Sequence, residues 1–147
     1  MSRSSRFLLC TCLALVFSAG CSKEIAVVDT QDTAIASVAR LYGEYLATHE
    51  NKPPRNEQTF RDYLGSLPSE QRRAMGLADL AKGLTSPRDG KPFIILCGSS
   101  YGKIEYAEST IVVCEQVGTD GIIMAADSFG AVYKIPTDEA KQVLPID

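Results

Sequence analysis

A dense turn signal at residues 86–92, Ser-Pro-Arg-Asp-Gly-Lys-Pro, separates two parts of the chain that carry different hydrophobic patterns. Before it, residues 32–50 place apolar side chains at helical spacing, from Ile35 to Leu46. After it, short runs rich in β-branched residues predict strands at residues 93–97, 110–117, 122–126 and 131–135. The two patterns predict an α+β domain in which one long amphipathic helix, followed by short helices, packs on an antiparallel meander of about four strands.

Local signals define the ends of these elements. Asp29, Thr30 or Asp32 can cap the long helix, and the pair Pro53-Pro54 ends it, because proline disfavours the helical conformation in the residue before it. Residues 118–121 and 127–130 are short turn sequences, so the strands that flank them are expected to form antiparallel hairpins.

The turn segment Ser86 to Phe93, the segment Cys114 to Gly121 and the closing hairpin resemble those of bacterial pilin-like domains related to type II secretion pseudopilins, over about residues 33–135. The resemblance implies a helix packed on an antiparallel sheet, with no active site. Pseudopilins also retain an apolar N-terminal helix that inserts into the membrane and drives filament assembly. In this sequence the apolar run, at residues 7–19, lies before a predicted cleavage site that precedes Cys21. We therefore expect a pilin-like head that does not polymerise.

An apolar run near the N-terminus predicts export. Arg3 and Arg6 give it a basic start, and residues 7–19 are almost wholly apolar, as in a secretory signal peptide. A helix of this length would span only about 20 Å, which is short of the roughly 30 Å hydrocarbon layer of a membrane. A cleaved signal peptide is therefore favoured over a permanent membrane helix.

The run ends at Ser18-Ala19-Gly20-Cys21, which resembles the lipobox of bacterial lipoproteins. The resemblance implies cleavage before Cys21 and attachment of diacylglycerol to its thiol, with acyl chains that anchor the protein in a membrane. Residues 1–20 are then the removed signal, residues 21–31 a tether and residues 32–147 a single domain. Ser22 is compatible with sorting to the outer membrane. The alternative is an ordinary signal peptide cleaved after Ala19 or Gly20, which leaves Cys21 as a free thiol.

Charge gives little sign of a polyanionic partner. The formal net charge is −3, and removal of Arg3 and Arg6 with the signal changes it to −5. No block of five like charges occurs in the sequence, so no nucleic-acid footprint and no polybasic membrane patch is expected. Membrane attachment would depend on the lipid at Cys21, and we expect the tethered head to be a monomer.

Three of the five cysteines are assigned by these expectations, because Cys10 and Cys12 leave with the signal and Cys21 carries lipid. Cys97 and Cys114 remain, and an exported compartment favours a disulfide between them across neighbouring strands. The alternative is a Cys-His nucleophile that uses His49, the only histidine, although no catalytic signature surrounds either cysteine.

Other candidate site residues give weaker signals. Tyr42, Tyr45 and His49 share one helical face and could present polar groups to a ligand, but core packing is the commoner use of such residues. A lone histidine without suitably spaced partners does not predict zinc, so no metal and no cofactor is expected. Acidic residues flank the hairpins, and some pseudopilins hold calcium in a sheet loop. Solvated turns are the favoured interpretation of these three acids: Glu115, Asp120 and Asp127.

Three functions remain at this stage. The first is a non-enzymatic, lipid-anchored envelope protein whose pilin-like head binds another envelope or secretion-system protein. The second is a lipoprotein that binds or inhibits through a small-ligand pocket. The third is a small hydrolase that uses His49 with acidic partners, which is the least favoured because a hydrolase motif such as His-Glu-x-x-His does not occur in the sequence.

Overall fold

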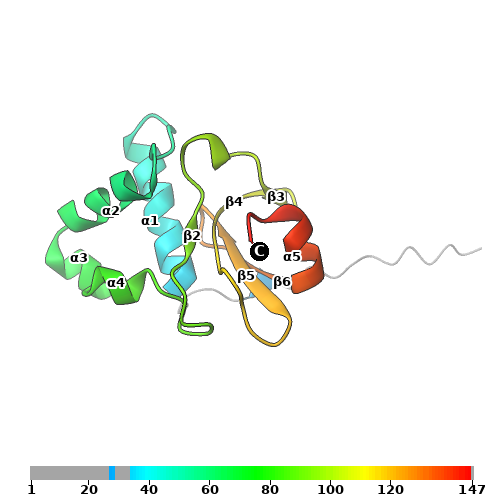
Figure 1. Ribbon diagram of the computed structural model, residues 1–147. Coiled ribbons are helices and arrows are strands. Elements are labelled where there is room, and N and C mark those ends of the chain that lie inside the picture. The colour runs from blue at the N-terminus through cyan, green and yellow to red at the C-terminus, as the bar shows by residue number, and fades with distance from the viewer. Residues whose placement is uncertain (1–26, 29–33, 147) are drawn as a thin grey trace, which may run out of the picture.

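The structure is a computed structural model that describes residues 27–28 and 34–146. The predicted signal peptide, the lipidation site Cys21 and most of the predicted tether lie outside these residues. The described part is an α+β domain with an antiparallel sheet and several helices, which confirms the predicted fold class (Figure 1).

The sheet has a central meander of three strands: β4 (Ser109–Cys114), β5 (Ile122–Asp127) and β6 (Val132–Pro136). β2 (Ile94–Ile95) pairs with β4, and β1 (Val27–Val28) pairs with β6, so the order is β1-β6-β5-β4-β2. A short strand β3 (Glu105–Tyr106) also pairs with β4. β1 falls in the segment that the sequence predicted to be a tether, so part of that segment belongs to the sheet of the domain.

The helices lie on two sides of this sheet (Figure 1). On one side are α1 (Ala34–Thr48), α2 (Glu57–Ser66), α3 (Ser69–Ala74) and α4 (Leu80–Gly83). On the other side is α5 (Thr137–Val143), which follows β6 where no helix was predicted, and a short 3₁₀ helix spans Gly98–Ser100.

The long helix α1 buries one side chain or more in each of its turns against the sheet. Tyr42 is completely buried, and its hydroxyl donates a 2.6 Å hydrogen bond to the carbonyl oxygen of Leu96. The helix ends before the Pro53-Pro54 pair, because Glu50 and Asn51 adopt left-handed backbone conformations with φ of 57° and 59°. The N–H of Asn51 then donates back to the carbonyl of Leu46 at 2.9 Å, which closes the last turn.

Apolar side chains form one core on each face of the sheet. The larger core joins α1, α2 and α4 to the sheet, and the smaller core includes Ala140 of α5. The register of β4 against β5 shifts between Ile111 and Val113, so both Val112 and Val113 join the α1 core while Ile111 and Cys114 join the α5 core. Both faces of the sheet are therefore apolar, which explains the runs of consecutive apolar residues in its strands.

The turn at residues 86–92 is fastened to the β4–β5 hairpin by Asp89. One carboxylate oxygen, Oδ2, accepts from the N–H groups of Val117 (3.1 Å) and Gly118 (2.9 Å), and the other accepts from Lys91 N–H at 2.9 Å. Partial burial alone would raise the pKa of Asp89, but these hydrogen bonds outweigh burial and hold the pKa below its usual range.

We expect Asp89→Asn to lower the free energy of unfolding by about 1 kcal/mol at pH 7, because the amide is a weaker acceptor than the carboxylate. A carboxyl group with a lowered pKa in the folded state stabilises the protein above its ordinary pKa, about 3.9, and loses this effect as pH falls further. The difference between the two proteins should therefore shrink in urea titrations at pH 3. Asp120→Asn, in the exposed part of the same hairpin, serves as the control, and equal effects of the two variants at pH 7 would contradict the prediction.

Candidate functional site

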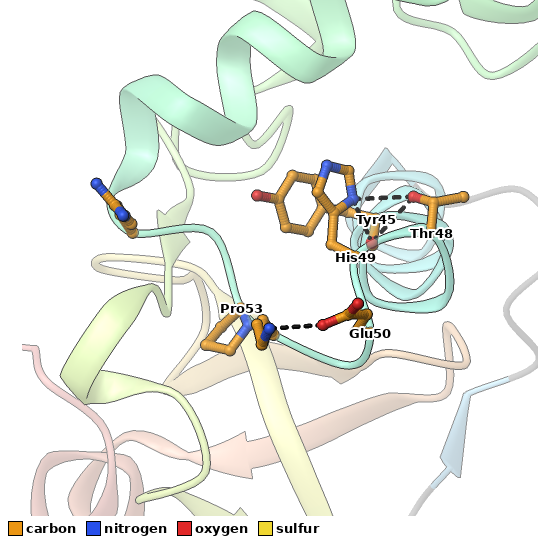
Figure 2. Close-up of a pocket in the computed structure, with 7 residues that line it drawn as sticks. Tyr45, Thr48, His49, Glu50 and Pro53 are labelled. Carbon is orange, nitrogen blue, oxygen red and sulfur yellow. Dashed lines mark hydrogen bonds and ion pairs between the residues drawn. The ribbon is translucent and has the colours of Figure 1, made fainter.

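The only histidine of the chain lies in a cavity of about 500 Å³ between the end of α1 and the segment that leads to α2 (Figure 2). The His49 ring stacks on the ring of Tyr45, with centroids 3.9 Å apart and planes 5° apart. Tyr63 of α2 packs edge-on against both rings. The structure thus brings together Tyr45 and His49 of the predicted helical face, whereas Tyr42 is buried in the core.

Hydrogen bonds hold the His49 ring against its own helix. Nδ1 lies 2.8 Å from the carbonyl oxygen of Tyr45 and 3.0 Å from Oγ1 of Thr48 (Figure 2). The carboxylate in the same cavity, that of Glu50, forms an ion pair with Lys52 at 2.6 Å. A general base in a catalytic triad is oriented by a third group and contacts a nucleophile. In the described cavity the imidazole is oriented by a backbone carbonyl and a threonine hydroxyl instead.

The cysteine prediction needs correction, because Cys97 and Cys114 are both free thiols in the structure. β2 and β4 pair Ile94 with Cys114, so Cys97 lies three residues further along, about 10 Å at the rise of a strand. Disulfides span at most about 7 Å between Cα atoms. The two thiols also pack in different cores, Cys97 with the α1 core and Cys114 with the α5 core.

We expect both thiols to react slowly with iodoacetamide in the folded protein at pH 8. Burial raises the pKa of Cys97 to about 11 and that of Cys114 to about 12, so the reactive thiolate is scarce. In urea without reductant both should be alkylated promptly, as peptide mass spectrometry can measure. A sample reduced beforehand is the control. Labelling in urea that requires reduction would show that the two cysteines are bridged.

The three hairpin acids do not share one environment, and two of them are not solvated as expected. Glu115 is only 2% exposed and Asp127 only 5%, whereas Asp120 lies in the exposed β4–β5 turn. No group of three or more His, Cys, Asp or Glu side chains suited to a metal ion occurs among the described residues. Glu115 and Asp127 can be buried because each carboxylate accepts hydrogen bonds that compensate for its removal from water.

Glu115 forms the buried polar centre of the turn at residues 86–92. Its Oε1 accepts from the Ser86 hydroxyl at 2.7 Å, and its Oε2 accepts from Arg88 at 2.7 Å and from the N–H of Met124 at 2.9 Å. A cavity of about 190 Å³ adjoins this group at the start of α1. Because the polar groups there are already paired with one another, this arrangement fits a structural role.

A further cavity, of about 380 Å³, lies where the end of α1 meets the β5–β6 turn. Asp127 and Phe129 both line it, and Phe129 is 88% exposed. Oδ1 of Asp127 accepts from the N–H groups of Phe129 and Ala131, both at 3.0 Å, so the turn that carries the aromatic ring is internally held. The sequence predicted the turn from Asp127 to Gly130 but gave no signal that its aromatic residue would face solvent.

No protein-family model matches the chain, and neither does a curated protein or a solved structure. None of the helices in the described residues combines the length and the apolar character needed to cross a membrane.

Proposed function

We propose that the protein is a lipid-anchored cell-envelope protein of non-enzymatic type, whose pilin-like head binds another envelope or secretion-system protein. Residues 1–20 direct export, and acyl chains on Cys21 hold the monomer at a bacterial membrane, the outer membrane by preference. The packing of α1 across an antiparallel sheet supports the pilin-like part of the proposal.

The exposure of Phe129 is the observation that carries a binding role. Large aromatic side chains supply much of the free energy at protein interfaces, where they leave water on binding. Phe129 sits on a short turn braced by Asp127, and Gly43 of α1 lies close to the backbone of the preceding residue, Ser128. A braced turn loses little conformational entropy when a partner binds, so it can present the ring as an anchor.

Site-specific photo-cross-linking in cells tests this assignment. A benzophenone amino acid in place of Phe129 should form an adduct with one defined envelope protein, identified by mass spectrometry. The same residue at position 117, on the opposite end of β5, is the control, because Val117 is 59% exposed and also lies in a hairpin turn. Equal adducts from both positions, or none from position 129, would refute a binding surface at Phe129.

The anchoring step has its own test. Mass spectrometry of the protein extracted from membranes should find a diacylglyceryl cysteine at position 21 as the N-terminal residue, and Cys21→Ser should abolish membrane retention. An unmodified N-terminus at any other position would overturn lipidation.

The cavity beside His49 supports a second candidate, a lipoprotein that binds a small ligand. Its volume of about 500 Å³ falls in the range of ligand sites, and the stacked rings of Tyr45 and His49 offer an aromatic wall. His49→Ala separates the candidates, because it should weaken a ligand in this cavity and leave cross-linking from position 129 unchanged. Loss of a hydrolytic activity in a folded His49→Ala variant would instead favour an enzyme.

A further inference from the structure

The cavity next to Phe129 is built from three separated parts of the chain. The segment after α1 contributes Asn51, the segment around β3 contributes Tyr101 and Glu108, and the end of β5 contributes Asp127. Its volume of about 380 Å³ is large enough for a long side chain of a partner. The residues that line it combine two aromatic rings with several hydrogen-bonding groups.

The charge of this cavity is one-sided. Glu108 is exposed at its rim, Asp127 is buried in its wall, and none of the described residues that line it carries a positive charge. Arg40 passes beside Gly130 in the same turn but is not among the lining residues. The cavity around His49 differs, because Lys52 and Arg55 line it together with Glu50.

Asp127 retains capacity for a further donor. A carboxylate has about four acceptor positions, and the two N–H groups of the turn occupy those of Oδ1. The Tyr133 hydroxyl lies 3.1 Å from Oδ2 and 2.7 Å from Oγ of Ser109. Oδ2 therefore keeps one acceptor position that neither the turn nor Tyr133 occupies, and a charged donor forms the stronger hydrogen bond to a carboxylate.

We infer that the cavity receives an arginine side chain of the partner protein, with its guanidinium group between the ring of Phe129 and the carboxylates of Glu108 and Asp127. This inference rests on the proposed function, since the partner supplies the side chain. Arginine fits better than lysine because its planar group stacks on an aromatic face and directs several donors outward at once. A neutral polar ligand could use the hydroxyl groups but would gain no charge-assisted hydrogen bond with either carboxylate.

The probe for this inference is N-acetyl-arginine amide, titrated into the ¹⁵N-labelled protein that has been extracted from membranes in detergent. Backbone amide shifts at residues 108–110 and 127–130 should change and saturate. N-acetyl-citrulline amide has nearly the same shape without the charge, and it should bind at least fivefold more weakly. N-acetyl-lysine amide should fall between the two.

Two substitutions test the named contacts, and one serves as a matched control. Glu108→Gln should weaken the arginine probe about fivefold, and Phe129→Ala should weaken it by a similar factor through loss of stacking. Glu50→Gln should have no effect, because Glu50 is also exposed and also has a left-handed backbone, with φ of 57° against 63° for Glu108, but lines the other cavity. Thermal melts of all three variants establish that they remain folded.

The outcomes separate the inference from the proposed function. Equal binding of the arginine and citrulline probes, or no effect of Glu108→Gln, would overturn the proposed arginine-binding site. No response to the arginine probe, with a partner still cross-linked from position 129, would overturn this inference and leave the proposed function standing. Binding of the probe without any cross-linked protein would keep the cationic site and count against the protein partner.

Discussion

Replacement of Arg88 by methionine should lower the free energy of unfolding by about 3 kcal/mol. Arg88 is the counter-ion of Glu115, whose side chain is 2% exposed, whereas that of Arg88 is 26% exposed. Removal of one partner leaves a buried charge without compensation, which typically costs about 3–5 kcal/mol. We expect a loss at the lower end of this range of free energies because water reaches part of the Arg88 side chain. In addition, the Ser86 hydroxyl and the N–H of Met124 still donate hydrogen bonds to Glu115.

Urea unfolding measures this loss, and two further variants establish its cause. Lys52→Met breaks the Lys52–Glu50 pair, whose side chains are 75% and 80% exposed, and its effect should be too small to measure. The double variant Arg88→Met with Glu115→Gln should recover part of the loss, because the amide needs no counter-ion. A loss in Arg88→Met no greater than that in Lys52→Met would contradict the assigned role of the pair.

Substitution of Gly43 by alanine should destabilise the protein by about 2 kcal/mol, although alanine is normally preferred in a helix by about 1 kcal/mol. A Cβ atom on Gly43 would clash with the backbone carbonyl oxygen of Ser128, so α1 or the β5–β6 turn must move. Movement of this turn should also displace Phe129, so cross-linking from position 129 is expected to fall in the same variant.

Gly65 in α2 gives the matched control for Gly43. A Cβ atom there would meet nothing within 4 Å, so Gly65→Ala should leave stability unchanged or raise it slightly. Thermal or urea unfolding of the two variants is the measurement. A stabilising effect of Gly43→Ala would show that the helix and the turn are not in the close contact described.

The fold class was open to prediction because hydrophobic spacing and turn residues are local signals. The period of the apolar residues before Ser86 and the β-branched runs after it were enough to predict an α+β domain. The strand β1 was missed because it has only two residues, both valines, and its sequence resembles a tether. It becomes a strand only through its pairing with β6, which is distant in the sequence. The helix α5 was missed because its short amphipathic sequence gains stability mainly from packing on the sheet.

The candidate sites were less predictable, because they depend on register and burial. An exported compartment favoured a disulfide between the two remaining cysteines, but the register places Cys114 opposite Ile94, and the two thiols pack in different cores. The acids of the hairpins looked like solvated turn residues. Burial of Glu115 follows from Ser86 and Arg88, which lie 29 and 27 residues away in the sequence.

The sequence by itself determined the change from helix to strands at residues 86–92, since this depends on neighbouring residues alone, and the export signal and the lipobox at Cys21 stay predictions from the same kind of local pattern. The tertiary structure decided which polar groups meet. It buried Glu115 beside Arg88, stacked His49 on Tyr45, and left Phe129 in solvent above Asp127. Contacts between distant residues arise only when the sheet register and the path of α1 are fixed, because both cores must be closed at once.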